Sequence, residues 1–510
     1  MKKGICKLIW CCLYFLPALF PTVYLLLNDG VDHAVKMNQR RWGLLGNSLW
    51  IAGSCATVCV VISMFAAMRL YSAFHTKPVL RWFFLILAPV PSYIYALSYM
   101  NLIRFLGKFV PGLLRWRMAG MVPCIIVESL AFLPYACAAA LIGLEQMDRK
   151  EWKAALLLQD ADRVFWKIVL PRQLPYLIAM GAVIFVLSVT DYSIPSLFQV
   201  NVYAMEIFSD YSAVGQSVHS LSLALPLIAV ASVVIVLALV PMRNVSRPDT
   251  TGEPMAPQYS KELRRIGSCA VAVLVAQIVF PFLSFFPYLG RLTEAVVPAG
   301  RELMNSFITG IWAVILLTIP AAGMALLLGE KMAEKFFLWI VAVFPLAVPG
   351  MLSGIGVLKL FSDTPLHVFR SGNFMPAVGM AVRYLPLAMM IQYGCYLRMD
   401  RDRIRAARLL QRYPGEAFWR VQLHLMRPGL VISGIVIFLL TLGDVGTALI
   451  LMPAGREPLS VKIYNYLHYG STETVAVFCM LQVAVCVLLM GTLYIVLRRK
   501  TLWNRQKGEA

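Results

Sequence analysis

The amino-acid sequence predicts an all-α polytopic membrane protein with about twelve transmembrane helices, arranged as two parallel six-helix repeats. The chain of 510 residues is 60% hydrophobic and only 14% charged, whereas soluble domains carry about 25% charged residues. Apolar runs of the length that crosses a bilayer, about 20 residues, recur along the sequence. Several sequence patterns also occur twice, about half a chain apart.

Six apolar runs precede a polar stretch, and six follow it. The runs lie near 7–27, 45–69, 82–103, 119–143, 175–198, 219–241, 266–288, 305–328, 336–358, 375–397, 428–451 and 474–497. The first run has a basic start like a signal peptide, but it is too long and lacks a small-x-small cleavage site, so we interpret it as a membrane span. The polar stretch RNVSRPDTTGEPMAPQYSKELRR is typical of a linker. We therefore predict membrane domains at 1–241 and 265–510, joined by a cytoplasmic linker at 242–264.

The repeated patterns keep a nearly constant spacing. NSLWIAGS at Asn47 is similar to NSFITGIW at Asn305, and MDRKEWKAALLLQ from Met147 is similar to MDRDRIRAARLLQ from Met399. FLPYACAA matches YLPLAMMI, FWKIVL matches FWRVQL, and GAVIFVLSVTD matches GIVIFLLTLGD, with all offsets between 252 and 258 residues. Chance similarity between apolar runs would not keep this register, so we infer an internal duplication. Six spans per half place both copies the same way up in the membrane.

Charge predicts the orientation. The net charge of +20 comes from basic residues between the apolar runs, which fits the positive-inside bias rather than a nucleic-acid partner. With both termini in the cytoplasm, 32 of the 46 Lys and Arg lie inside and 13 outside, and Arg383 lies within a span. We expect a multi-pass protein of the cytoplasmic (inner) membrane, embedded in the lipid bilayer. One predicted outer loop departs from the rule, with Arg104, Lys108, Arg115 and Arg117.

The sequence shows no catalytic or metal-binding pattern. Its cysteines lie singly or in small groups within apolar runs, which is typical of buried packing. The six histidines are scattered, and no glycine-rich phosphate loop with Lys-Ser/Thr is present. We therefore expect no enzyme activity, no cofactor, no metal and no disulfide framework.

One repeated segment resembles a soluble loop. Each copy predicts a short helix with a basic residue before two alanines, and Phe-Trp follows where aromatic side chains favour the membrane interface. The residues are Lys153, Ala154, Ala155, Leu158 and Gln159 in the first copy, and Arg405, Ala406, Ala407, Leu410 and Gln411 in the second. A single such loop would suit an interfacial helix that packs under the bundle. Two copies in register favour docking of a two-fold partner.

These loops resemble a known family. The cytoplasmic coupling loop of permeases in binding-protein-dependent ABC importers has a typical pattern. It consists of Glu-Ala-Ala, three residues, Gly, nine residues and then Ile-x-Leu-Pro. KAALLLQ with FWKIVLP, and RAARLLQ with FWRVQLH, resemble that pattern. Two further segments resemble the one that follows the coupling loop in ferric-iron and thiamine importers, in which two permease domains are fused. They are TLGDVGTALILMPAGREPLSVKIYNYLHYGS and SVTDYSIPSLF. The resemblance covers nearly the whole chain.

The two loops depart from the family pattern in parallel. Lys153 and Arg405 replace Glu, Gln159 and Gln411 replace Gly, and His424 replaces the final Pro of the second copy. The first copy is also one residue short. These changes favour a matched, divergent ATPase surface.

The resemblance implies a permease that forms the substrate pathway. Its partners would be ABC ATPase subunits, two copies under the two loops, and an extracytoplasmic solute-binding protein. Ferric iron is the first expected substrate and thiamine the second, while the basic outer loop would equally suit a small anion such as a phosphonate. Two alternatives stay open. An ion-gradient-driven secondary transporter would need charged or broken-helix sites at mid-membrane but no twin loops, and a membrane enzyme would need clustered His, Asp or Cys.

Polar groups within the spans are candidates for the pathway. Glu128 and Arg383 are ionisable, and their positions in the repeat differ by three residues, so they either pair between the halves or find local partners. Asp191, followed by Tyr192, is equivalent to Asp444. These residues either line the pathway, as the resemblance implies, or act as helix-end carboxylates at the interface. Asn47 and Asn305 are predicted to be helix caps.

Overall fold

The structure is a computed structural model of the chain. It describes residues 2–28, 30, 36–74, 90–109, 119–147, 149–215, 217–243, 258–329, 332–397, 399, 401–413, 416–468 and 472–506. Most of the predicted linker, the start of the third apolar run, and Arg115 and Arg117 of the basic outer loop lie outside these residues.

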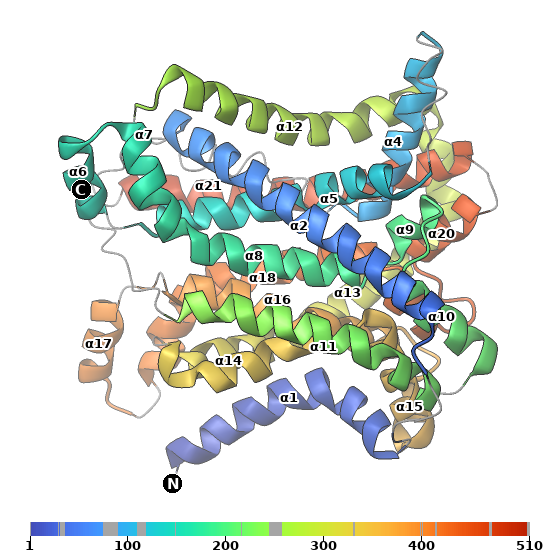
Figure 1. Ribbon diagram of the computed structural model, residues 1–510. Coiled ribbons are helices and arrows are strands. Elements are labelled where there is room, and N and C mark those ends of the chain that lie inside the picture. The colour runs from blue at the N-terminus through green and yellow to red at the C-terminus, as the bar shows by residue number, and fades with distance from the viewer. Residues whose placement is uncertain are drawn as a thin grey trace. The chain divides into compact units, whose positions relative to one another are not determined.

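Helices account for all the regular secondary structure of the described residues, and these contain no strand (Figure 1). The longer helices of the first half are α1 (Lys2–Asn28), α2 (Gln39–Ala73), α4 (Ser92–Gly107), α5 (Met121–Glu145), α8 (Leu170–Val189) and α11 (Ser217–Met242). Those of the second half are α12 (Lys261–Phe285), α13 (Leu292–Leu328), α14 (Phe336–Val343), α15 (Gly350–Asp363), α16 (Phe374–Leu397), α18 (Leu423–Gly443) and α21 (Thr472–Gln506). The shorter ones are α6 (Arg149–Leu158), α7 (Ala161–Val164), α9 (Ser193–Leu197), α10 (Tyr203–Val214), α17 (Arg401–Leu410), α19 (Gly446–Leu451) and α20 (Leu459–His468). Two π-helical turns, η2 (Phe165–Val169) and η7 (Phe418–Gln422), and the 3₁₀ turns η3 (Phe286–Arg291), η4 (Ala333–Lys335), η5 (Phe344–Ala347) and η6 (Pro365–Phe369) complete the set.

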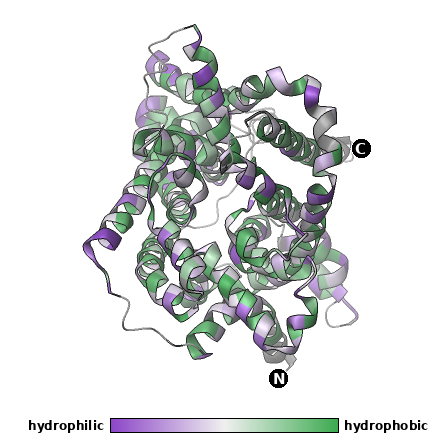
Figure 2. Cartoon of the chain, turned by 90° about the vertical axis from the view of Figure 1, so that its right-hand side faces the viewer, coloured by the Kyte–Doolittle hydropathy of each residue, from purple (hydrophilic) through white to green (hydrophobic). Residues whose placement is uncertain are grey.

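The membrane-spanning helices agree with the predicted apolar runs. Among the described residues, ten helices are long and apolar enough to cross a membrane, and a bent helix pair brings the number to eleven. Helix α4 begins within the predicted third run at 82–103 and continues past its end to Gly107, while the start of that run is not described. Figure 2 shows that hydrophobic residues predominate along the helices. The structure therefore confirms an all-α polytopic membrane protein.

Several spans differ from the sequence prediction in their ends or their shape, among them the fifth, the ninth and the eleventh. The fifth and eleventh were expected at 175–198 and 428–451, but the structure has Ala161–Val189 and Phe418–Gly443, each followed by a break and a short helix. The ninth, expected as one helix at 336–358, bends by 89° between α14 with η5 and α15. Pro345 and Pro349 lie at this bend, and proline interrupts a helix because it lacks a backbone N–H donor.

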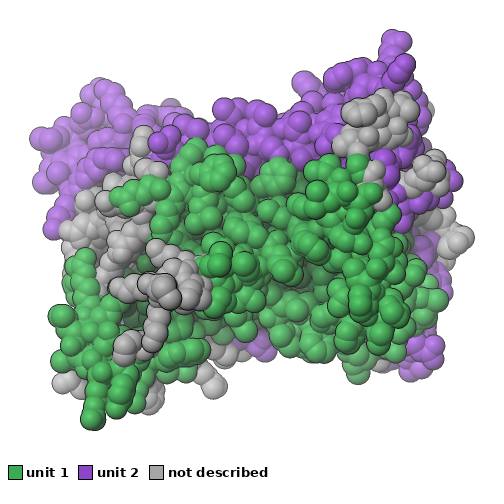
Figure 3. All heavy atoms as spheres, turned by 90° about the horizontal axis from the view of Figure 1, so that it is seen from below, with its two compact units in different colours: residues 1–30, 304–458 green, residues 31–303, 459–510 purple. Residues whose placement is uncertain are grey.

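The chain packs as two compact units (Figure 3). Unit 1 comprises residues 1–30 and 304–458, and unit 2 comprises residues 31–303 and 459–510. The units therefore do not coincide with the sequence halves. In unit 1, α1 packs on second-half helices, and the Tyr14 hydroxyl donates to the Ala342 carbonyl at 2.7 Å. In unit 2, α12 packs on first-half helices, and the Gln277 amide donates to the Tyr95 hydroxyl at 2.6 Å. The predicted domains at 1–241 and 265–510 are defined by the duplicated sequence, not by compact packing. They therefore stay a prediction.

The core of unit 2 lies between α2, α5 and α8. Small side chains allow these helices to approach closely, among them Cys55, Cys59 and Cys137, which are fully buried. The Cys59 thiol donates to the Ser129 carbonyl at 3.2 Å. The ten cysteines that the structure describes in full are all free thiols. This helix trio fixes the positions of the loops at both ends of α8.

Candidate functional site

The first repeated loop forms α6, which is amphipathic. Its inner face carries Trp152, which is 1% exposed and stacks on Tyr71 of α2, with ring centroids 5.5 Å apart and planes 25° apart. Ala155 and Leu156 are half-buried against the same core. The spacing 152, 155 and 156 places these side chains on one helix face. That face anchors α6 to unit 2.

The opposite face of α6 is open. Lys153, Ala154 and Gln159 are exposed. Leu157 and Leu158 are 87% and 83% exposed, although both are large apolar side chains. Adjacent exposed leucines on a short helix are typical of a surface that another molecule covers.

The second loop forms α17 and repeats this arrangement in unit 1. Ile404 is buried at the position equivalent to Trp152, and Ala407 is half-buried at the position equivalent to Ala155. Arg405 and Ala406 are exposed, and Gln411 is half-buried. Leu409 and Leu410 are each 86% exposed. Figure 1 shows α6 and α17 as separate short helices. At positions 252 residues apart, Leu157 and Leu409, and Leu158 and Leu410, have matching exposure.

Both loops return to a membrane span through the same unusual turn. Phe165–Val169 and Phe418–Gln422 are π-helical and occupy equivalent positions; such turns are rare and frequent at functional sites. In the first loop, Phe165 is buried and packs edge-on against Tyr259 at 5.9 Å, and the Asp162 carboxylate accepts from the Ser260 backbone N–H at 2.8 Å. Burial raises the pKa of the Tyr259 hydroxyl, which therefore stays neutral. The turn is thus fixed to the segment that leads into α12.

Asp444 is the centre of a buried polar cluster in unit 1. Its Oδ2 accepts from the Arg383 guanidinium at 3.0 Å and from the Tyr384 hydroxyl at 2.9 Å. Thr447 of α19 donates its backbone N–H to Oδ1 at 3.0 Å and its hydroxyl to Oδ2 at 3.1 Å. The side chain of Asp444 is 1% exposed and that of Arg383 16%. The carboxylate therefore joins α16 to the break between α18 and α19.

Gly350 makes room for this ion pair. It begins α15 at the 89° bend, and a Cβ atom there would lie 2.6 Å from Arg383 Nη1 and 2.9 Å from the Thr447 hydroxyl. Any larger residue would displace the guanidinium or the threonine. The bend thus brings an unsubstituted stretch of backbone against a buried charge pair.

Glu128 lies in unit 2 with a different partner. It is fully buried in α5, and its Oε2 accepts from the Ser188 hydroxyl of α8 at 2.9 Å. The structure thus gives Glu128 and Arg383 separate local partners. Of the two alternatives that the sequence left open, a pair between the halves or local partners, this is the second. Asn47 and Asn305 are not helix caps, because α2 and α13 begin at Gln39 and Leu292.

Asp191 lies two residues after the end of α8, in the break before α9. Its Oδ1 accepts from the Ser193 backbone N–H at 2.8 Å and from the Ser193 hydroxyl at 2.7 Å. Tyr192 is 3% exposed; its ring stacks on Phe208 of α10 at 5.7 Å and meets Tyr464 of α20 edge-on at 6.0 Å. Burial and the nearby Asp191 carboxylate raise the pKa of the Tyr464 hydroxyl, against a hydrogen bond with Ser196. Asp191 and Asp444 are therefore both helix-end carboxylates, although their partners differ.

Several residues of these sites escape sequence reasoning. Trp152, Leu157 and Leu409 carry the anchored and exposed faces of the loops, and helical spacing from the alanine pair could have identified them. Gly350 and Tyr384 give no sequence signal, because only the bend and the helix packing bring them to Asp444. Across the described ranges, no three His, Cys, Asp or Glu side chains gather in a way that could hold a metal ion.

Comparison with known proteins places this architecture in a class. No family model matches the chain. It is 20% identical over 505 residues to the ferric transport system permease protein FbpB of Actinobacillus pleuropneumoniae, covering 90% of this chain and 73% of that protein. It is 24% identical over 258 residues to the putative 2-aminoethylphosphonate transport system permease protein PhnV of Salmonella paratyphi A, covering 45% of this chain and 95% of that protein.

A third relative gives a shorter match. The chain is 29% identical over 158 residues to the spermidine/putrescine transport system permease protein PotC homolog of Mycoplasma pneumoniae, covering 30% of this chain and 54% of that protein. The fold is that of a multi-pass membrane protein, and these three relatives are permease proteins of transport systems. They confirm the resemblance to ABC importer permeases that the repeated loops indicated.

Proposed function

We propose that the chain is the fused, two-domain permease of a binding-protein-dependent ABC importer, and that α6 and α17 are its two ATPase-coupling helices. The observation that carries this proposal is the matched exposure of Leu157, Leu158, Leu409 and Leu410 on two equivalent helices. An ATPase subunit on each helix would cover these side chains. The ATP-driven approach of the two ATPases would then rock the two halves and open the pathway to each side in turn.

Two further observations support a duplicated permease. The Asn47 side chain donates to the Asn201 carbonyl at 3.2 Å, and the equivalent Asn305 donates to the Glu457 carbonyl at 3.4 Å. A conserved contact between equivalent positions is expected when two domains descend from one ancestor. In addition, nearly the whole phosphonate-system relative, 95% of its length, aligns with only 45% of this chain. The ferric-system relative instead aligns with 90% of this chain.

The orientation follows from the same reasoning. In unit 2, α6 and α7 precede α8, whereas α9 and α10 follow it, so these short helices lie at opposite ends of a 20-residue span. The excess of Lys and Arg on the α6 side favours a cytoplasmic position for it, with both termini on that side. Helices α9 and α10 then face the extracytoplasmic side, where a solute-binding protein delivers its cargo.

Ferric iron is the first proposed substrate, because the relative that aligns over most of the chain belongs to a ferric transport system. Thiamine and a small phosphonate are the alternatives. Asp191, Tyr192, Asp444, Glu128 and Arg383 are the proposed pathway residues. The cargo of the binding protein that co-purifies with the permease would identify the substrate directly.

The test is capture of an ATPase from membranes with a C-terminally tagged chain in mild detergent. We expect an ATPase with the unchanged chain and none with Leu158→Glu plus Leu410→Glu, since both leucines are exposed and tolerate a charge without unfolding. The matched control is Lys261→Glu, an exposed charge change at the start of α12, which should keep the ATPase. Absence of an ATPase from every sample would contradict the proposal.

An ion-gradient-driven secondary transporter is the second candidate. The bent pair at Gly350 beside the buried Arg383–Asp444 pair favours it, because such transporters build sites from broken helices and intramembrane charges. Uptake into cells depleted of ATP but keeping a proton gradient would support this alternative. Loss of uptake on ATP depletion alone would support the importer.

A further inference from the structure

Three aromatic side chains meet at the proposed extracytoplasmic end of α8. Tyr192 lies between Phe208 of α10 and Tyr464 of α20, and the Tyr464 hydroxyl is 3.4 Å from the Ser196 hydroxyl of α9. All of these residues belong to unit 2, although Tyr464 comes from the second half of the sequence. The cluster therefore contains side chains from both halves.

Phe208 and Tyr464 occupy equivalent positions of the two halves. Aligning MEIFSDY from Met205 with VKIYNYL from Val461 pairs these two residues at an offset of 256. The same offset pairs Asn201 with Glu457, whose carbonyls accept the equivalent asparagine bonds. The stacked Tyr192–Phe208 contact thus lies within the first half, and the edge-on Tyr192–Tyr464 contact joins the halves.

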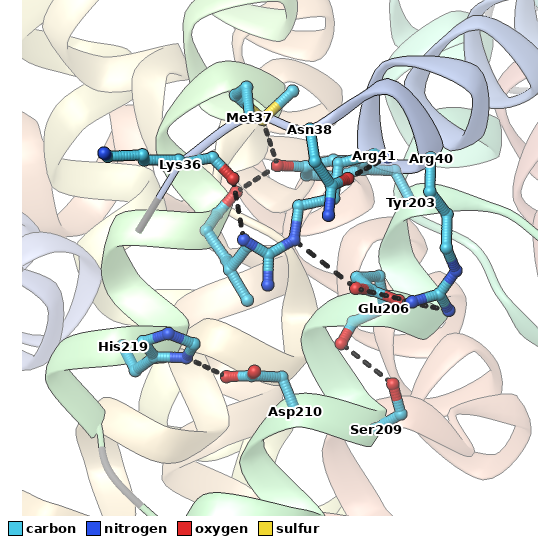
Figure 4. A network of polar contacts seen from close by, with 11 residues as sticks. Lys36, Met37, Asn38, Arg40, Arg41, Tyr203, Glu206, Ser209, Asp210 and His219 are labelled. Atoms are coloured by element: carbon cyan, nitrogen blue, oxygen red, sulfur yellow. Dashed lines mark hydrogen bonds and ion pairs between the residues drawn. The ribbon is translucent and has the colours of Figure 1, made fainter. Parts of the chain in front are cut away.

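The same alignment pairs Glu206 with Lys462, which have opposite charges. Glu206 of α10 is 8% exposed and accepts from Arg40 at 2.9 Å and from Arg41 at 3.5 Å, at the start of α2 (Figure 4). Lys462 of α20 donates to the Glu302 carboxylate at 2.7 Å and to the Pro298 carbonyl at 2.6 Å, both in the first part of α13. Helix α10 is therefore bound to α2, and α20 to α13, which are the second long helices of the two halves. In the first half the acidic residue is on the short helix, and in the second half it is on the long helix.

Other contacts hold α10 to the first half. The Asp210 carboxylate is 2.5 Å from the His219 ring at the start of α11, and the Tyr203 hydroxyl donates to the Leu223 carbonyl at 2.8 Å (Figure 4). Helix α10 thus has partners on α2 and α11, while α20 is tied to α13. Among the contacts of this cluster, the edge-on Tyr192–Tyr464 contact is one that joins side chains of the two sequence halves.

We propose that Tyr464 closes the extracytoplasmic end of the pathway against Tyr192 and Ser196, and that Lys462 and Glu206 are positioning residues that hold α20 and α10 for this closure. The inference rests on the proposed permease function. Two ion pairs of reversed polarity cannot exchange partners, because Glu206 and Glu302 repel each other, as do Lys462 and the arginines. Each short helix is therefore kept with its own half during rocking.

The test measures how well Tyr464 covers residue 196. Ser196→Cys changes one atom, and a membrane-impermeant maleimide applied to intact cells reports its exposure through peptide-resolved mass spectrometry. We expect slow labelling in the otherwise unchanged chain and about tenfold faster labelling with Tyr464→Ala. Tyr464→Phe, which keeps the ring, should label slowly.

The ion pair is tested in the same background. Lys462→Glu should speed labelling of the cysteine at 196, because it meets Glu302 as a like charge, and adding Glu302→Lys should restore slow labelling. Rescue by this double reversal would not occur if Lys462 only filled space. Met205→Cys, at an exposed position on α10, should label rapidly in every background and report folding and insertion.

Two results would overturn the closure. One is labelling at 196 as fast as at 205 in the unchanged chain, and the other is no change with Tyr464→Ala. Because labelling needs no ATPase, failure of the closure is distinguishable from failure of ATPase capture.

Discussion

At the scale of single residues, Asp444 shows how a membrane charge is stabilised. Desolvating a carboxylate and a guanidinium is costly, and their attraction offsets the cost only when further hydrogen bonds complete the site. Tyr384 and Thr447 supply those bonds, and Gly350 leaves space for the guanidinium. Glu128 has the simpler solution of one hydroxyl donor from a neighbouring helix.

Asp444→Asn should lower the free energy of unfolding by about 3–5 kcal/mol, because it leaves the Arg383 guanidinium without its countercharge. Adding Arg383→Gln should recover part of the loss, since it removes the uncompensated charge. Unfolding in mixed detergent micelles measures both. Asp402→Asn, in an exposed pair on α17, is the control and should change little. Equal losses in the single and double variants would show that the ion pair is not the cause.

At the scale of elements, α6 and α17 separate anchoring from docking. One face of α6 is held by Trp152 against Tyr71, and the other carries leucines that contribute little to the fold. The same division on α17 uses Ile404 in place of tryptophan. Stability and partner binding should therefore respond to different residues of one helix.

Trp152→Ala should destabilise unit 2 by about 3–5 kcal/mol, because a large buried aromatic side chain leaves a cavity. Leu158→Ala, six residues along the same helix, should change stability by about 0.5 kcal/mol or less, since the side chain is already exposed. Hydrogen exchange of the α6 amides should rise with the first variant and stay unchanged with the second. Faster exchange with both would mean that Leu158 also anchors the helix.

At the scale of the whole molecule, each sequence half contributes its first helix to the unit that contains the core of the other. Helix α1 packs on α15 and α16, and α12 packs on α2 and α4. Small residues permit such approaches where lipid supplies no hydrophobic driving force. Gly356 is one of them, because a Cβ atom there would lie 2.7 Å from the Pro21 carbonyl oxygen of α1.

Gly356→Ala should destabilise unit 1 by about 1–3 kcal/mol, because the new methyl group pushes α1 away through its rigid backbone. Gly354→Ala is the matched control two residues away on α15, where the nearest atom to a Cβ would be 3.4 Å away on Ile450. That variant should be neutral or slightly stabilising, since alanine favours a helix over glycine. Thermal unfolding of the two purified variants compares them. Equal midpoints would contradict close packing of α1 on α15.

The sequence by itself determined the approximate place of the spans that the structure describes. Twenty apolar residues can satisfy their backbone in a bilayer only as a helix, and this requirement is local. It also located α6 and α17, because repetition marks a segment without any knowledge of its contacts. The π-helical turns at Phe165 and Phe418 escaped prediction, since hydropathy is the same in an α- and a π-helical turn.

Tertiary structure decided which groups meet. Arg383 is three repeat positions from Glu128, yet it pairs with Asp444, which lies at the break between α18 and α19. The bend before Gly350 places that glycine against the same pair. Likewise, the packing of α1 and α12 decided which long helices form each compact unit. Periodicity specifies which face of a helix is apolar, but the partner of that face depends on contacts between residues hundreds of positions apart.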